Sequence, residues 1–318
     1  MSGVRLPIGE HRSDFSPKRR NFMEKRLNNP VVSADATATD PRPYALGYSR
    51  RELQRLELQG ALIRDFTEDL LRRAGIQPGM RVLDVGCGVG DMSLLAAKLV
   101  GPRGMVLGVD RSAEALDIAE RRAIETGQCY WTRFAAGDFD TFACDETFDA
   151  VIGRLVLMYL SDPSATLRRL AGHVQPGGIV AFQELAMPLT RSFPEGELFS
   201  RCVGWISDTI ERAGFEVDMG SRLPMTFAAA GLPAPQMVSA GLTGSGPASP
   251  LYNYVAETLR SLLPMAERLG IATADEIGID TLAERLCREA VEQRACVMTP
   301  PFVGAWTNMP GWEEAASV

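Results

Sequence analysis

The sequence predicts an α/β fold in which a doubly wound, mostly parallel sheet of seven strands carries a helical insertion late in the chain. Three observations lead to this prediction. Short β-rich runs alternate with helical runs between residues 81 and 187, a glycine-rich turn follows the first of these runs, and longer helical stretches come afterwards. Because β–α–β crossovers place helices on the faces of a sheet, the alternation is typical of parallel strands.

The N-terminal part divides into an arm and a helix. Residues 1–43 are polar and lack apolar periodicity, so we expect a flexible arm; partner binding by its basic cluster at 18–20 is the alternative. Over residues 44–73 leucines recur at spacings of three and four, which predicts a helix. Glycine and proline in "GIQPGM" end that helix.

The core is expected to contain five strands and the helices between them. The predicted strands are residues 81–85, 105–109, 131–136, 148–152 and 179–184, and the predicted helices are 92–99, 113–126 and 165–173. "QPGG" is expected to turn before the fifth strand.

Residues beyond the core are expected to complete the sheet and to cover it. The β-like runs are 236–242 and 296–306, the latter interrupted by Pro300 and Pro301, and the helical runs are 196–214 and 251–294. We therefore divide the chain into the arm, a ligand-binding core with its leading helix (44–187), and a remainder (188–318). In that remainder a helical cap, over about 190–215 and 250–295, is expected to form a substrate pocket.

Composition excludes several classes of protein. The chain has 318 residues, of which 46% are hydrophobic, enough for a core without disulfides. Its six cysteines form no CxxC pair and its two histidines are far apart, so no metal site is expected. A net charge of −7 disfavours nucleic-acid binding. Without an apolar run for a membrane span or a signal peptide, we expect a cytoplasmic protein; a homo-oligomer is left open.

The glycine-rich turn lies in "VLDVGCGVGD", residues 82–91, where Gly86, Gly88 and Gly90 are spaced GxGxG. Backbone N–H groups at the start of the next helix attract anions, and in the dinucleotide fingerprint GxGxxG the anion is a pyrophosphate. Here the third glycine comes one residue early, and Asp91 stands where a pyrophosphate would be repelled. Together with Asp84, it favours a ligand that carries a cation; a plain strand-to-helix turn is the alternative.

Two further acidic residues follow the next strands. Asp110 in "GVDRS" can accept both hydroxyls of a ribose, although it could instead cap the next helix, for which Ser112 is the better candidate. Asp138 in "GDF" can accept from an exocyclic amine, and Phe139 could flank an adenine. Since the carboxyl ends of parallel strands meet at one edge, these residues together describe an adenosine with a charged tail.

The motifs "VLDVGCGVGD", "GVDRS", "AAGDF", "FDAVIGRLVLMYL" and "VQPGG" resemble, in order and spacing, those of class I S-adenosylmethionine-dependent methyltransferases. The resemblance covers about residues 44–187 and is nearest to the ubiquinone- and menaquinone-biosynthesis type. It implies a Rossmann-like methyltransferase fold, S-adenosylmethionine as methyl donor and S-adenosylhomocysteine as product. "GRLVLMYL" replaces the asparagine-containing stretch that often follows strand four in that type, so a ubiquinone-pathway role is in doubt.

The resemblance also implies contacts with the cofactor. Asp84 would lie near the ammonium group, Asp110 would hold the ribose, and Arg154 with Leu155 would pass behind the sulfonium. Tyr48 and Gln59 could close over the methionine end, or belong to an ordinary helix face. The predicted cofactor-binding residues are Tyr48, Gln59, Asp84, Gly86, Gly88, Gly90, Asp110, Arg111, Asp138, Phe139 and Arg154.

Two residues are candidates for catalysis. Methyl transfer needs an aligned nucleophile and the exclusion of water, and it needs a base only where a proton must leave. Glu184, at the end of the fifth strand, could be that base; a solvated or helix-capping carboxylate is the alternative. Arg154 could bind an anionic group of the substrate, or pair internally with Asp84, Asp110 or Glu184.

The substrate is expected to be small and largely apolar, because a helical cap over the strand ends would enclose it. Tyr48, Arg154, Glu184 and Trp205 are the predicted substrate contacts; for Trp205, as for Tyr252 and Tyr254, core packing is the alternative. We favour carbon methylation, with an isoprenoid or another secondary-metabolite precursor as acceptor. The alternatives are O- or N-methylation, an NAD-binding oxidoreductase and a noncatalytic nucleotide-binding protein.

Overall fold

The computed structural model describes residues 50–138, 144 and 146–311. The expected arm, residues 1–43, lies outside this described part, as do Tyr48 and Phe139. Within the described part, every helix is too short or too polar to cross a lipid bilayer.

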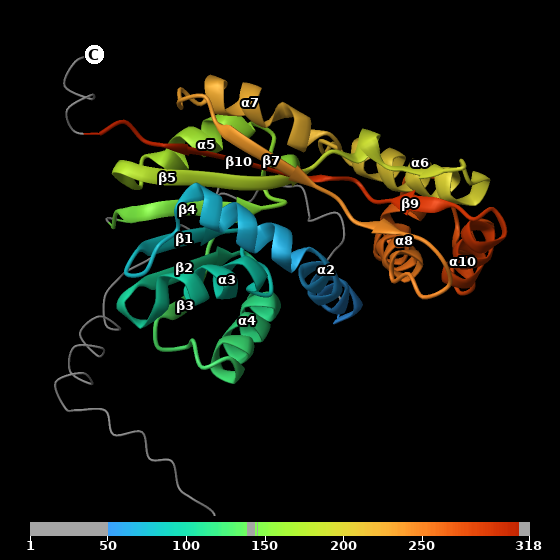
Figure 1. The fold of residues 1–318 in the computed structure, drawn as a ribbon, viewed down its shortest axis with the longest axis horizontal. Helices are drawn as coiled ribbons and strands as arrows, with labels where there is room; N and C mark the ends of the chain where they lie inside the picture. Colours follow the sequence, from blue (N-terminus) through green and yellow to red (C-terminus); the bar gives the residue numbers. More distant parts are fainter. Residues whose placement is uncertain (1–49, 139–143, 145, 312–318) are drawn as a thin grey trace, which may run out of the picture. The chain divides into compact units, whose positions relative to one another are not determined.

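The central sheet has seven strands in the order β3-β2-β1-β4-β5-β10-β7. The first five strands of the chain run parallel, and β10 runs antiparallel between β5 and β7 (Figure 1). The prediction of a seven-stranded, mostly parallel sheet is therefore confirmed. The strands of this sheet are β1 (Arg81–Val85), β2 (Met105–Asp110), β3 (Thr132–Ala136), β4 (Phe148–Arg154), β5 (Val174–Leu185), β7 (Gln236–Ala240) and β10 (Phe302–Asn308).

Helices cover both faces of the sheet, as Figure 1 shows. Alternate residues of β1 serve two cores: Val82 packs with Leu70 and Leu71 of the long leading helix, whereas Leu83 and Val85 belong to the core on the opposite face. This period of two is the property of a strand buried on both sides. The helices are α2 (Arg50–Ala74), α3 (Asp91–Val100), α4 (Ala113–Glu125), α5 (Pro163–Ala171), α6 (Glu197–Arg212), α7 (Met219–Ala229), α8 (Leu251–Arg268), α9 (Ala274–Ile277) and α10 (Leu282–Glu292).

Two predictions from the sequence, the turn at "QPGG" and the single β-like run 296–306, were wrong. "QPGG", expected as a turn, lies inside β5, where Gly177 takes a positive φ of 78° and the register with β4 shifts. The run 296–306 is two strands, since prolines 300 and 301 have no N–H to continue a ladder. β9 (Cys296–Met298) joins β6 (Arg191–Phe193) and β8 (Thr243–Gly244) in a separate small sheet, and β10 joins the main one.

The cap consists of α6, α8 and α10 with the small sheet, grouped beside one end of the main sheet in Figure 1. Glu289 of α10 holds the start of α6: its Oε1 accepts from the N–H of Leu198 at 2.8 Å, and its Oε2 accepts from the N–H of Phe199 at 3.0 Å. These N–H groups have no partner within α6, so a carboxylate there satisfies them and complements the helix dipole.

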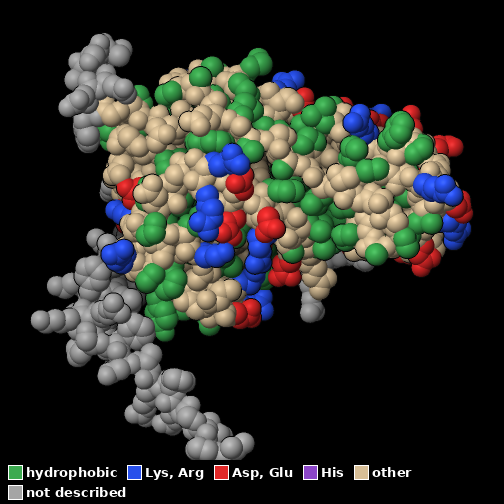
Figure 2. Space-filling model, in the orientation of Figure 1, with side chains coloured by type: hydrophobic (Ala, Val, Ile, Leu, Met, Phe, Trp, Pro, Cys, Tyr) green, Lys and Arg blue, Asp and Glu red, His purple; other side chains and the backbone are tan. Residues whose placement is uncertain are grey.

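Charges of both signs are interspersed on the face that Figure 2 shows. On α2, Arg72 pairs with Glu68 and Arg73 pairs with Asp69, each four residues apart.

Replacing Glu289 should loosen the cap. Glu289→Ala leaves two N–H groups of α6 unpaired, so we expect the free energy of unfolding to fall by about 1–2 kcal/mol. Urea denaturation measures this change. Glu292→Ala, on the same helix but exposed, is the matched control and should change stability by less than about 0.5 kcal/mol. Equal losses in the two variants would contradict the capping role.

Candidate functional site

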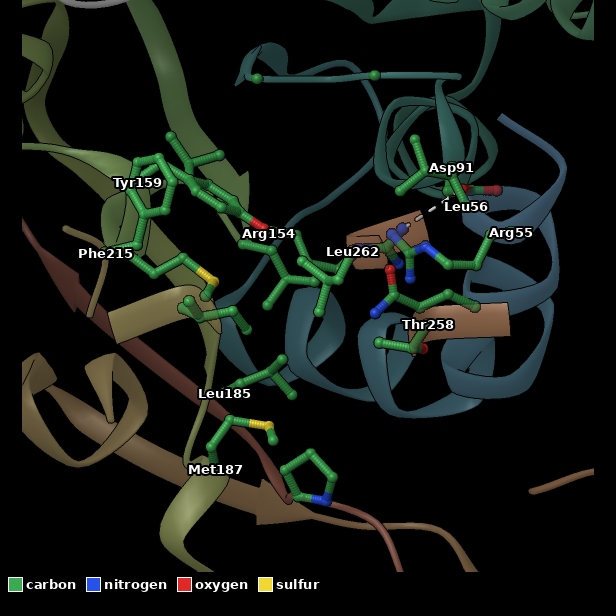
Figure 3. Close-up of a pocket in the computed structure, with 18 of the residues that line it drawn as sticks. Arg55, Leu56, Asp91, Arg154, Tyr159, Leu185, Met187, Phe215, Thr258 and Leu262 are labelled. Carbon is green, nitrogen blue, oxygen red and sulfur yellow. Dashed lines mark hydrogen bonds and ion pairs between the residues drawn. The ribbon is translucent and has the colours of Figure 1, made fainter. Parts of the chain in front are cut away.

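One cavity opens at the carboxyl ends of β1, β2 and β4 and continues under α6 and α8. Its two ends differ in chemistry. In Figure 3, Asp91 and Arg55 lie on one side, and Tyr159, Phe215 and Met187 lie on the other. The charged lining residues are Arg55, Asp84, Asp91, Asp110, Arg111 and Arg154, and the large apolar ones include Met158, Leu185, Phe199, Ile206, Ile210 and Leu262.

The glycine turn forms the floor of the charged end. Gly86, Gly88 and Gly90 have φ angles of 62°, 52° and 82°, a conformation that side chains with a Cβ rarely adopt. A Cβ added to Gly88 would meet no atom within 4 Å, so conformation rather than crowding requires glycine there. The turn leads directly into α3 and leaves its backbone open to a ligand.

Asp110 closes the other side of this floor. Its Oδ2 accepts from the N–H of Gly88 at 2.8 Å, and its Oδ1 accepts from the N–H of Ser112 at 2.9 Å. Ser112, not Asp110, caps α4, by accepting from the N–H of Ala115. Burial raises the pKa of Asp110. Both oxygens are thus fixed by the backbone, and each keeps acceptor capacity toward the cavity.

Asp84 is the most deeply buried acid of the cavity wall. Its Oδ2 accepts from the hydroxyl of Ser93 on α3. Burial raises its pKa to about 7, with Asp110 and Asp91 adding repulsion and Arg154 acting in the opposite direction. A cationic ligand group nearby would stabilise the ionised form.

Arg154 pairs with Asp91, not with the three acids considered from the sequence. Its Nη2 lies 3.4 Å from Asp91 Oδ2 (Figure 3). Its Nη1 donates to Thr67 Oγ1 at 3.3 Å. Arg122 of α4 lies closer to Asp91, at 2.6 Å, and also donates to the carbonyl of Val89 in the glycine turn. One carboxylate thus serves two guanidinium groups, of which Arg154 lines the cavity.

Gly60 makes this arrangement of Asp91 sterically feasible. A Cβ on Gly60 would lie 2.4 Å from the carboxylate of Asp91, so α2 and α3 approach closely only with glycine at this position. Leu155, next to Arg154, has a φ of 54°, which is rare for a residue with a Cβ. Its N–H donates to the carbonyl of Gln183, and the turn directs the following residues along the cavity.

Gln59 lines the cavity and joins the leading helix to the cap. Its Nε2 donates to the hydroxyl of Tyr254 on α8 at 2.9 Å, and Tyr254 also lines the cavity. Arg55, one turn earlier on α2, is a lining residue that the sequence analysis missed. Its Nε and Nη2 donate to the two carboxylate oxygens of buried Glu52, each at 2.7 Å. Arg55 lies in the arginine-rich start of this helix, and no pattern in the sequence distinguished it from the neighbouring arginines.

The residues expected around an adenine are only partly brought together. Arg111 lines the cavity, and its Nη2 lies 3.7 Å from Asp138 Oδ1. Asp138 itself is not among the lining residues, and Phe139 lies outside the described part of the chain.

Glu184 does not line the cavity. It is fully buried, and its Oε1 accepts from the N–H groups of Val156 and Leu157 at 2.9 and 2.8 Å, while Oε2 has no hydrogen-bond partner. Burial raises its pKa to about 7 against the effect of these backbone bonds. The carboxyl group of Glu184 therefore holds the segment after β4 through backbone N–H groups. This role is close to that of a helix-capping carboxylate, one of the alternatives considered from the sequence, and differs from that of a solvated carboxylate.

Trp205 also lies off the cavity. Its ring is stacked by the guanidinium of Arg201, 4.8 Å from the ring centroid, and it packs at the margin of the core. The neighbouring Ile206 and Phe199 line the cavity instead. The 3.6-residue period places residues of α6 on different faces, and sequence alone did not identify the inward one.

The sheet order with its antiparallel β10, the glycine turn after β1 and the carboxylate after β2 define a Rossmann-like methyltransferase fold. Residues 76–208 match the family model described as a methyltransferase domain. Residues 76–208 thus carry a methyltransferase domain of the class I S-adenosylmethionine-dependent type.

Relatives share this domain. The chain is 36% identical over 123 residues to a 2-phytyl-1,4-naphtoquinone methyltransferase of Synechococcus elongatus, covering 37% of this chain and 53% of the relative. It is 31% identical over 126 residues to a demethylmenaquinone methyltransferase of Anoxybacillus flavithermus, covering 40% of this chain and 53% of that one. The match thus spans about half the length of these relatives.

The fold extends further than this similarity in sequence. A putative methyltransferase of Bacillus halodurans superposes with a TM-score of 0.53 at 14% identity, covering 77% of this chain and 98% of that one. This likeness supports the fold alone.

Glu184 should make stability depend on pH. Its folded pKa of about 7 lies above the ordinary value of 4.5, so the folded protein keeps the proton longer than the unfolded chain. Stability should therefore fall as pH rises from about 4.5 to about 7, by at most about 1.4 kcal/mol per pH unit for this group. Glu184→Gln should flatten that slope, as measured by urea midpoints across this range.

The exposed Glu292→Gln is the control for this experiment and should keep the slope of the unmodified protein. Asp84 is present in all three proteins and contributes the same background. An unchanged slope in Glu184→Gln would show that Glu184 is ionised in the folded state throughout.

Proposed function

We propose that the protein transfers the methyl group of S-adenosylmethionine to a small, largely apolar metabolite. The observation that carries this proposal is the continuity of the cavity, which runs from the glycine turn to an apolar chamber under α6 and α8. A donor at the charged end and an acceptor at the apolar end would meet near Arg154 and Leu155.

The charged end fits the cofactor chemically. S-adenosylmethionine carries a ribose, an ammonium, a carboxylate and a sulfonium with an activated methyl group. Asp110 would accept from the ribose hydroxyls, the backbone at Gly86 and Gly88 would approach the methionine moiety, and Asp84 would lie near its ammonium. Arg55, held by Glu52, and Gln59, held by Tyr254, would line the methionine end from α2.

Arg111 and Asp138 would flank the adenine in this proposal, and Gly90 would start the helix behind the turn. Tyr48 and Phe139 belong to the proposed cofactor site by resemblance alone, since they lie outside the described residues.

The protein's own contribution to the reaction is positioning and exclusion of water. Apolar side chains of the cap would hold the acceptor against the donor. We assign this function to the cap segments at about 190–215 and 250–295, from which Phe199, Ile206 and Leu262 reach the cavity. The tether between Gln59 and Tyr254 would keep the cap closed on the cofactor side.

Arg154 would bind an anionic group of the acceptor. Arg154 lines the cavity between its charged and apolar ends, and its partner Asp91 is shared with Arg122. A guanidinium held by Thr67 and Asp91 is oriented before the ligand arrives, which lowers the entropic cost of binding.

Carbon methylation is our preferred reaction, with an isoprenoid or related precursor as acceptor. Tyr159 and Phe215 in the apolar wall form an edge-to-face pair, with ring centroids 5.2 Å apart. Aromatic faces stabilise a developing cation, as attack by an alkene or an activated ring requires. Glu184 would act in this scheme by fixing the segment that carries Met158 and Tyr159. Trp205 would pack at the margin of the core without touching the acceptor.

Calorimetric titration tests the cofactor assignment. S-adenosylhomocysteine should bind, NADH should not, and Asp110→Asn should weaken S-adenosylhomocysteine binding by about tenfold to a hundredfold, because an amide cannot accept at both positions. The exposed Asp117→Asn on α4 is the control and should bind normally. Equal affinity for the two variants would contradict the role of Asp110.

The methylated atom can be identified with S-adenosylmethionine labelled in its methyl carbon and a panel of apolar acceptors. We expect the product's labelled methyl to have the NMR shift of a carbon-bound group. An oxygen- or nitrogen-bound shift would favour the alternative, and cofactor binding without any product would favour a noncatalytic protein.

A further inference from the structure

A second hollow opens on the surface next to the apolar end of the cavity. It is lined by residues of β6, β8 and β9 and the segments joining them to the main sheet, and two of these residues, Thr190 and Thr299, also line the cavity. These threonines therefore lie between the two spaces. The remaining lining residues of the outer hollow are Pro188, Leu189, Arg191, Gly241, Leu242, Thr243, Met298 and Pro301.

We propose that the outer hollow is a second mouth of the cavity, through which an apolar chain of the methyl acceptor passes. This inference rests on the proposed function, in which the apolar end of the cavity holds the acceptor. The cofactor would occupy the charged end, and the acceptor's chain would leave at the opposite end, past Thr190 and Thr299.

The wall between the two spaces suits an uncharged chain. The hydroxyl of Thr190 donates to the carbonyl of Met187 at 2.7 Å, and Thr299 Oγ1 accepts from the N–H of Leu242 at 3.1 Å. Both hydroxyls are thus engaged with the backbone. Along the cavity wall, the charged residues of the described chain belong to the glycine turn, α2 and the ends of β2 and β4. Arg191 lines the outer hollow but not the cavity, so the passage between the two spaces is lined by uncharged side chains.

Two large apolar side chains are exposed on the segment that borders the hollow. Leu189 lines the hollow and is 59% exposed, and Phe193, at the end of β6, is 75% exposed. Large apolar side chains with this exposure gain free energy when a ligand covers them.

The structure around the mouth is built from short elements. β6 and β9 have three residues each and β8 has two, so few ladder bonds hold them together. Regions with few backbone bonds open at low free-energy cost. The wall formed by Thr190 and Thr299 can therefore move without unfolding the main sheet.

A series of straight-chain alkyl carboxylates tests this mouth, with the protein saturated by S-adenosylhomocysteine and the probes below their micelle concentrations. Each methylene that enters an apolar site should increase affinity up to about fourfold, from roughly 0.8 kcal/mol. With an open mouth, affinity should keep rising with chain length and level off only where the chain reaches solvent. A closed chamber would instead give a maximum followed by a steep loss, and that result would overturn the proposal.

Thr190→Trp narrows the mouth and Thr190→Ala widens it. We expect Thr190→Trp to weaken the long probes by at least about tenfold, with short probes and S-adenosylhomocysteine binding unchanged, and Thr190→Ala to retain the long probes. Met225→Trp, exposed on α7 and lining neither space, is the control. If Thr190→Trp binds long probes as the control does, the proposal fails while S-adenosylhomocysteine binding stays intact. Loss of that binding in the unmodified protein would refute the proposed function instead.

Discussion

The site depends on the ion pairs that the carboxylate of Asp91 forms with two arginines. This carboxylate lies between Arg122 of α4 and Arg154 of β4, at the first residue of α3, and Gly60 of α2 leaves room for it. Four elements thus meet at one side chain. Arg122 also holds the carbonyl of Val89, so the ion pair and the shape of the glycine turn are coupled. The side chain of Asp91 is only 10% exposed, and a carboxylate buried to this degree is stable only when it is paired. Its two arginine partners therefore link the glycine turn to the sheet.

The two ends of the cavity are built by different parts of the chain. The charged end is made by strand termini and turns, where backbone N–H groups and carboxylates converge. The apolar end is made by the cap, whose helices are held together by Glu289 at the start of α6 and by the bond from Gln59 to Tyr254. A donor with several polar groups and an acceptor with few would therefore bind at separate places and meet at Arg154.

Glu184 shows how a residue at a favourable position in sequence can have another role in three dimensions. The end of a parallel strand is where catalytic groups gather, and Glu184 is at such an end. Its side chain turns to the N–H groups after β4 and stays out of the cavity, so it acts on the segment that lines the cavity. Arg55 is the converse case, since it lines the cavity from a helix whose surface residues look alike in sequence.

The sequence by itself determined the sheet and the charged end of the site. Strand periodicity, the glycines at 86, 88 and 90, and Asp84 and Asp110 are local signals, because a turn conformation and a strand terminus depend on neighbours in the chain. Only the tertiary structure decided the partner of Arg154, the inward face of α6, the separation of β9 from β10 into different sheets, and the second mouth beside Thr190. These features arise from contacts between segments far apart in sequence, and the relative placement of such segments is set by packing, which no local pattern encodes.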